Sequence, residues 1–236
     1  MSNEIVKVGP SALAVPDFVQ KGDLRGSESI TREDLQMPRV ALAQSLSPEL
    51  DETDPKYIEG LKMGDAFNTL TGEVYGKKPL RVVIVRADRP RFVEFNPRDA
   101  GGGIKDFDIP ANDPRCLFGP NGEKPVATKF VEFVALVGEG LEPALLSFKG
   151  SGLKTARQIA GLLKLRQVPA FAQTFYLTPT IQKNSKGTFA VFNVKAGGFV
   201  DEQTYKYAEQ VYESVKDRAI STDHLEDAPA EEVQPF

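Results

Sequence analysis

Three carboxylates, Asp106, Asp108 and Asp113, cluster within eight residues of the sequence. Carboxylate oxygens are the ligands that Mg²⁺ prefers, so this cluster is compatible with a metal-dependent nuclease site. The residues around it are rich in Pro and Gly, and a solvated loop is the simpler interpretation. We therefore expect no metal and no cofactor.

Residues for other kinds of catalysis are scarce. One cysteine, Cys116, excludes an internal disulfide and a cysteine-based metal cage, and one histidine, His224, has no partner for a catalytic dyad. The stretch "FKGSGLKT" has glycines beside a lysine but lacks the pattern of a phosphate-binding loop. We expect a binding protein rather than an enzyme.

The charge is distributed unevenly. The chain has a net charge of −4, but residues 1–61 carry −5, residues 62–200 carry +8 and residues 201–236 carry −7. No Asp or Glu occurs between Ala144 and Val200, and we call residues 144–200 the acid-free segment. A purely cationic segment in an otherwise acidic chain favours a polyanionic ligand.

Aromatic residues are interleaved with basic residues on the predicted strands. Single-stranded nucleic acid is held in this way, because cations contact the phosphates while bases stack on aromatic rings. Strand alternation puts Phe175 and Leu177 on one face and Tyr176 on the other, so Tyr176 is the best stacking candidate. We expect one common cationic groove. The predicted single-stranded DNA-binding residues are Arg81, Arg86, Arg89, Arg91, Phe92, Lys149, Lys154, Arg157, Lys164, Arg166, Tyr176, Lys183, Lys186, Phe192 and Lys195.

The periodicity of the chain predicts mostly strands. Alternating or β-branched runs predict strands within residues 37–46, 65–95 and 130–148 and a long hairpin over 171–199. Three- and four-residue apolar spacing predicts one helix over 151–166 and another over 201–219. Residues 96–125 are rich in Pro and Gly and predict a long surface loop.

These elements predict a mainly β (α+β) fold, namely an OB-fold-like five-stranded barrel with an inserted helix and a C-terminal helix. We expect a flexible N-terminal arm over 1–36, a single domain over 37–218 and a disordered acidic tail over 219–236. No apolar run approaches the about 18 residues of a membrane span. The N-terminus lacks the pattern of a secretory signal, so we expect a soluble, cytoplasmic protein without membrane association.

The chain ends in an acidic stretch that is followed by Pro and Phe. A terminal aromatic ring with its carboxylate suits an apolar, basic-rimmed pocket on a partner, and the acids before it would steer it there. The predicted partner-binding residues are Glu226, Asp227, Glu231, Glu232, Pro235 and Phe236.

The ending "EEVQPF" resembles the acidic C-terminal tip of bacterial and bacteriophage single-stranded DNA-binding proteins. The stretches "MPRVALAQSLSPEL" and "GDAFNTLTGEVYG" are similar to phage-encoded proteins of replication modules. The resemblance implies an OB-fold core that coats single-stranded DNA in replication or recombination. It also implies recruitment of a polymerase, primase or helicase through Glu231, Glu232, Pro235 and Phe236. This chain departs from the pattern in having fewer contiguous acids and no tryptophan.

Several alternatives stay open at this point. A single-strand annealing recombination protein would share the cationic surface, a nuclease would use the Asp106 cluster with Mg²⁺, and a virion structural protein would bury all its aromatics. The formation of a homo-oligomer also stays open. A phage-encoded protein would act in the cytoplasm of the host cell.

Overall fold

A computed structural model describes Gly26 and residues 37–97, 102–185 and 187–217 of the protein. The chain divides into two units, Met1–Gln36 and Met37–Phe236, and every element named below belongs to the second unit. The expected N-terminal arm, apart from Gly26, and the acidic tail lie outside the described residues, as does Lys186.

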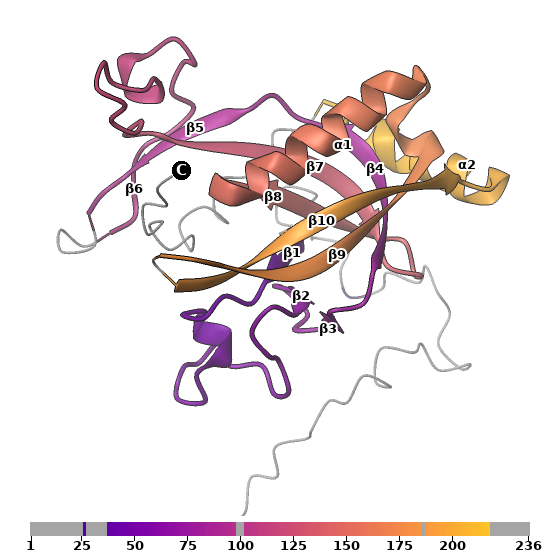
Figure 1. Ribbon diagram of the computed structural model, residues 1–236. Coiled ribbons are helices and arrows are strands. Elements are labelled where there is room, and N and C mark those ends of the chain that lie inside the picture. Colours follow the sequence, from indigo (N-terminus) through magenta and orange to yellow (C-terminus); the bar gives the residue numbers. More distant parts are fainter. Residues whose placement is uncertain (1–25, 27–36, 98–101, 186, 218–236) are drawn as a thin grey trace, which may run out of the picture. The chain divides into compact units, whose positions relative to one another are not determined.

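The described residues form ten strands and two α-helices (Figure 1). The strands are β1 (Arg39–Leu42), β2 (Ala66–Asn68), β3 (Val74–Gly76), β4 (Leu80–Ala87), β5 (Arg91–Phe95), β6 (Ile104–Asp106), β7 (Thr128–Val137), β8 (Glu142–Phe148), β9 (Gln173–Asn184) and β10 (Gly187–Phe199). The helices are α1 (Leu153–Arg166) and α2 (Glu202–Val215).

The strands form a strongly curled, open sheet (Figure 1). Its order is β10-β9-β4-β7-β8-β1-β2-β3, and β5 pairs with β7 and with β6 beside this path. The pairs are antiparallel except for β1 and β8, which are parallel. The prediction of a mainly β fold with an inserted and a C-terminal helix is confirmed. The predicted OB-fold-like five-stranded barrel is not confirmed. The sheet is not a closed five-stranded barrel, because its path ends in β10 on one side and β3 on the other.

The two helices cover opposite faces of the sheet, which we call the inner and outer faces. On the inner face, α1 packs through Ala156 and Ile159 on a core that includes Val82 and Phe175. On the outer face, α2 packs through Ala208 and Val215 on the alternate residues of β4 and β7. Alternation along each strand therefore buries apolar side chains on both sides, so residues 82–85 of β4 and 133–137 of β7 are apolar without interruption.

The side chain of Gln44, which follows β1, is hydrogen-bonded to the main chain of β10. Its Nε2 donates to the Ala190 carbonyl at 3.0 Å, and its Oε1 accepts from the Ala190 N–H at 2.9 Å. The Thr155 hydroxyl of α1 donates to the carbonyl of Phe192 on the same strand. Main-chain groups at a sheet edge would otherwise be free to pair with another chain. Gln44 and α1 thus cover part of the free edge of β10.

Local signals set the ends of both helices. The carboxylate of Asp201 accepts the N–H of Thr204 at 2.8 Å and caps the N-terminus of α2. Helix α1 ends at Arg166, because its C-cap Gln167 has a left-handed backbone (φ 51°) and Pro169 follows shortly after. Neither helix has the length and hydropathy that a membrane crossing requires in the described part of the chain.

Most of the predicted elements are confirmed. Strand β1 lies within residues 37–46, β9 and β10 form the predicted long hairpin, and α1 falls within 151–166. The predicted surface loop over 96–125 is more ordered than expected, because it contains β6 and a 3-10 helix over Pro114–Cys116.

Candidate nucleic-acid interface

Three predicted site residues meet in one row on the outer face of the sheet. Tyr176 on β9 pairs with Arg81 on β4 and with Lys195 on β10. Side chains that pair across neighbouring antiparallel strands have Cβ atoms about 4.5–5.5 Å apart. The row therefore places one cation on each side of a tyrosine, and we call Arg81, Tyr176 and Lys195 the outer row.

The tyrosine of the outer row is accessible, as strand alternation predicted. Phe175 and Leu177 are fully buried, whereas Tyr176 is 39% exposed. A Cβ atom at Gly197 would lie 2.9 Å from the Thr174 carbonyl oxygen and 3.1 Å from Tyr176 Cε2. Because Gly197 has no side chain, the edge of the tyrosine ring lies close to the backbone of β10.

Arg81 is held only loosely by its neighbour. Its guanidinium lies 3.8 Å from Glu139, whose side chain is 90% exposed. An ion pair of this kind contributes about 0–1 kcal/mol, so a phosphate can replace the carboxylate at little cost. Beside Arg81 lies a depression of about 330 Å³ that also contains Glu73 and Glu142. Burial and the charge of Glu142 raise the pKa of Glu73, and these carboxylates mark the end of the cationic surface.

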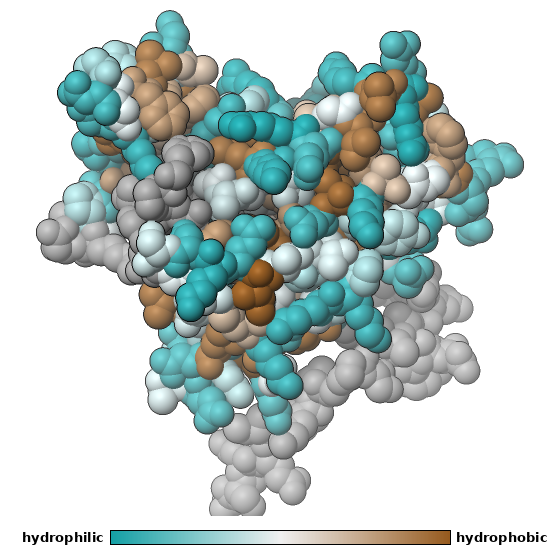
Figure 2. Space-filling view, viewed as in Figure 1, coloured by the Kyte–Doolittle hydropathy of each residue, from teal (hydrophilic) through white to brown (hydrophobic). Residues whose placement is uncertain are grey.

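Helix α1 carries a second set of cations. Thr155, Ala156 and Ile159 are buried against the inner face. The exposed side chains of α1 include those of Lys154, Arg157 and Lys164 as well as Leu165, and Figure 2 shows hydrophilic and apolar side chains together over this part of the surface. This grouping on a solvent-facing side agrees with the helical spacing of these residues.

The described residues do not bring the predicted cations into one common groove. The outer row lies on the face that α2 covers, whereas the α1 cations lie beyond the inner face. The two sets are therefore on opposite sides of the sheet. They are connected only around the free edge of β10, where α1 packs on that strand.

Arg86 and Arg91, both predicted to bind phosphates, have structural roles instead. The guanidinium of Arg86 donates to the Val215 carbonyl at the end of α2 and to Asp88 at 2.9 Å. Arg91 donates from Nε at 3.0 Å and from an Nη atom at 2.9 Å to Glu132, which is 1% exposed. Partners far away in the sequence engage both arginines, and for this reason neither is part of the site proposed below.

The two phenylalanines of the predicted site are packing residues. Phe192 is 7% exposed and lies 6.5 Å from Phe148 in the inner core, so it cannot stack on a base. Phe92 is half-buried against Ile109 and Cys116, and the Lys129 ammonium lies 5.7 Å from its ring centroid. Phe192 therefore lies in the core, and Phe92 lies partly buried at the edge of a smaller apolar cluster.

The other predicted cations are spread over the surface. Arg89 is exposed beyond β4, and Lys183 is exposed near the turn of the β9–β10 hairpin. The Lys149 ammonium lies 5.7 Å from the ring centroid of Phe130. Lys186 and the six tail residues Glu226, Asp227, Glu231, Glu232, Pro235 and Phe236 lie outside the described residues.

Phe199 is an exposed aromatic residue that is not among the predicted site residues. It is 66% exposed at the end of β10, and the Arg166 guanidinium lies 5.3 Å from its ring centroid. Arg166 also donates to the Gly197 carbonyl at 3.1 Å. The register of the hairpin shifts between Ala196 and Phe199, so simple alternation cannot predict where Phe199 points.

Two of the three carboxylates suggested for Mg²⁺, Asp106 and Asp113, are already paired with a side-chain cation. The guanidinium of Arg115 donates to Asp106 at 2.8 Å, to Glu94 at 2.9 Å and to Asp113 at 3.0 Å. Hydrogen bonds from Arg115 lower the pKa of Asp113, and those from Lys105 and Arg115 lower the pKa of Glu94. Within the described ranges, no group of three acidic, histidine or cysteine side chains could hold a metal.

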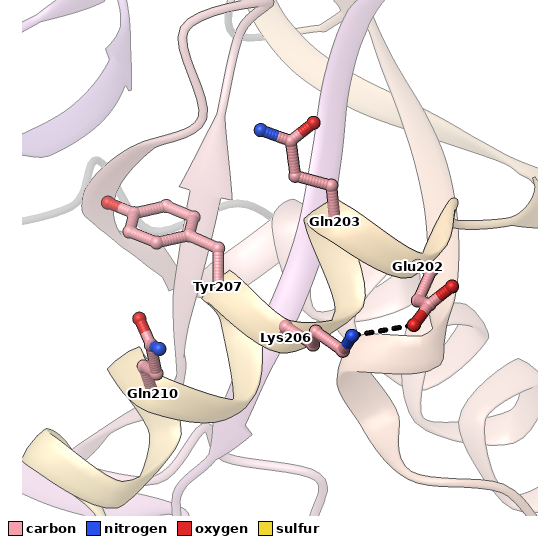
Figure 3. A pocket seen from close by; sticks show the side chains of 5 residues that line it. All are labelled: Glu202, Gln203, Lys206, Tyr207 and Gln210. Carbon is pink, nitrogen blue, oxygen red and sulfur yellow. Dashed lines mark hydrogen bonds and ion pairs between the residues drawn. The ribbon is translucent and has the colours of Figure 1, made fainter.

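Two further surfaces serve for comparison. The segment between β6 and β7 exposes four apolar side chains, those of Phe107, Leu117, Phe118 and Val126, and Figure 2 shows apolar and polar side chains together there. On α2, a shallow depression of about 560 Å³ is lined by residues that include Lys206 and Tyr207 (Figure 3). Lys206 is paired with Glu202 at 2.6 Å.

The structure thus defines a β-rich α+β protein with an open curled sheet and a cationic outer row. The chain belongs to the family of Pam3 phage gp34-like proteins, whose family model matches residues 8–221. The prediction of a phage-type protein is confirmed at this level. No curated protein and no solved structure gives a match.

Proposed function

We propose that the protein binds single-stranded DNA without sequence preference, with the outer row as the centre of its binding site. The observation that carries this proposal is the placement of an exposed tyrosine between two cations on neighbouring strands. A base stacks on the Tyr176 ring, and the phosphates on either side contact Arg81 and Lys195. Stacking tolerates any sequence, because every base has a π-face.

The charge around the outer row supports the proposal. Tyr176 and Lys195 belong to the acid-free segment, whose residues form β9, β10, α1 and most of β8. A phosphate backbone that crosses these elements meets no carboxylate of the segment itself. Thr180 and Asn193, which are hydrogen-bonded at 2.8 Å, add polar groups next to Lys195 along the hairpin.

The biological role in this proposal is the coating of phage DNA in replication or recombination. The acidic tail would then recruit a polymerase, primase or helicase, an idea that rests on the sequence of residues 226–236 alone. A single-strand annealing protein would use the same outer row, and annealing of complementary strands would distinguish the two roles.

The affinity for single-stranded DNA is expected to fall as salt is added. Each phosphate contact on a single strand contributes a slope of about −0.7 to log K against log salt concentration. Contacts from Arg81 and Lys195 therefore predict a slope of about −1.4 or steeper. Fluorescence anisotropy with labelled oligo(dT) in a salt series measures it, with a duplex of equal length as the control. A flat titration, or equal binding of the duplex, would contradict the proposal.

A further inference from the structure

The Phe199 side chain is exposed to solvent, and the guanidinium of Arg166 lies beside its ring. Its 66% exposure is the largest of any described phenylalanine or tyrosine. An exposed large apolar side chain gains nothing from the core, whereas a ring beside a guanidinium is a favourable contact for a stacked base. Phe199 therefore has the chemistry of a stacking residue.

Arg166 is held in place for this contact. It is the last residue of α1, and its hydrogen bond to the Gly197 carbonyl fixes the guanidinium while it lies 5.3 Å from the Phe199 ring centroid. A guanidinium that is already positioned loses little conformational entropy when a nucleotide binds. Its planar fork also has further N–H donors that suit a phosphate.

Gly197 connects this pair to the outer row. Its carbonyl accepts from Arg166, and the ring of Tyr176 lies close to its Cα. Phe199 pairs with Gln173, which precedes Tyr176 by three residues on β9. Gln173 and Tyr176 point to opposite faces of β9, so Phe199 lies toward α1 whereas Tyr176 lies on the outer face. At about 3.3 Å per residue, the backbone positions of the two rings are about 10 Å apart along the hairpin.

We propose that Phe199 and Arg166 form a second base-stacking platform, so that the site holds two bases that are not stacked on each other. This inference rests on the proposed function. Bases in a duplex strand are stacked about 3.4 Å apart, whereas two platforms on opposite sides of the β10 edge can only take bases that are splayed out, so they select a single strand. The platform lies where α1 packs on β10. A DNA strand bound to both platforms passes from the outer row around the edge of β10 toward Lys164.

Substitutions at Phe199 test the platform by oligo(dT) anisotropy on the full-length protein. Phe199→Ala is expected to weaken binding about tenfold through the loss of one stacked base. Phe199→Tyr keeps the ring and should bind like the wild type, whereas Phe199→Leu keeps apolar bulk and should bind like Phe199→Ala. Phe107→Ala removes a comparably exposed phenylalanine outside the acid-free segment and should leave the affinity unchanged.

An oligomer of abasic deoxyribose phosphates separates stacking from a structural role. This oligomer has phosphates but no bases. Phe199→Ala should therefore leave the affinity of the protein for the abasic oligomer unchanged, whereas Arg166→Ala should lower it. An equal loss on oligo(dT) and on the abasic oligomer would mean that Phe199 only anchors α1, which would overturn the inference. If the wild type does not bind oligo(dT), the proposed function fails. If Tyr176→Ala weakens binding and Phe199→Ala does not, only the second platform fails.

Discussion

Replacing Arg91 by alanine is expected to lower the free energy of unfolding by about 3–5 kcal/mol, because it leaves the buried Glu132 carboxylate without its cation. Glu132 is 1% exposed and accepts two charged hydrogen bonds from Arg91. The Ser147 hydroxyl, at 3.1 Å, is a neutral donor and cannot compensate for the lost charge. Urea denaturation followed by circular dichroism measures the change.

Arg89→Ala is the matched control for this experiment, because Arg89 lies two residues earlier and is exposed. It should change the free energy of unfolding by less than about 0.5 kcal/mol. Replacing Arg91 and Glu132 together by Met and Leu should cost less than Arg91→Ala alone, since no charge is then left buried. Equal stability of the Arg91→Ala and Arg89→Ala proteins would contradict the structural role of Arg91.

Removal of the outer row is expected to abolish most of the affinity for single-stranded DNA. The triple variant Arg81→Ala, Tyr176→Ala, Lys195→Ala loses one stacked base, about 1–3 kcal/mol, and two phosphate contacts. At low salt we expect binding to weaken about a hundredfold or more. The slope of log K against log salt should become shallower by about 1.4. Anisotropy titrations with oligo(dT) in the same salt series give both quantities.

The control for the triple variant is a double variant on α2, in which Lys206→Ala and Tyr207→Ala are combined. Tyr207 is 39% exposed, the same as Tyr176, and Lys206 is likewise exposed (Figure 3). These two side chains lie outside the acid-free segment, beside Glu202. Their removal should leave the affinity within a factor of about two. A similar loss in both variants would mean that the outer row is not the binding site.

Local periodicity was sufficient to predict the elements that carry the outer row. The long hairpin, the helix over 151–166 and the exposure of Tyr176 follow from alternation and from three- and four-residue spacing. The same alternation, continued across the hairpin, pairs Val194 with Leu177 and puts Phe192 on the buried face. The inward position of Phe192 depends on this register, which the residues of its own run do not determine.

Contacts between distant parts of the chain could not be predicted from the sequence. Arg86 reaches Val215, which lies 129 residues away, and Gln44 reaches Ala190, which lies 146 residues away. The open sheet depends on the parallel pairing of β1 with β8, for which no local pattern exists. The placement of α1 on the inner face is equally non-local. For this reason the sequence predicts a single cationic groove, whereas the structure has two cationic surfaces on opposite sides of the sheet.

The central claim, that a nucleic-acid base stacks on Tyr176, is tested most directly by ultraviolet crosslinking of the wild-type protein to oligo(dT). Mass spectrometry of the crosslinked peptides identifies the residues that contact bases. We predict crosslinks at Tyr176 on β9, in the peptide that carries the outer row. Crosslinks confined to Tyr207 on α2, or to Phe107 and Phe118 between β6 and β7, would contradict this account.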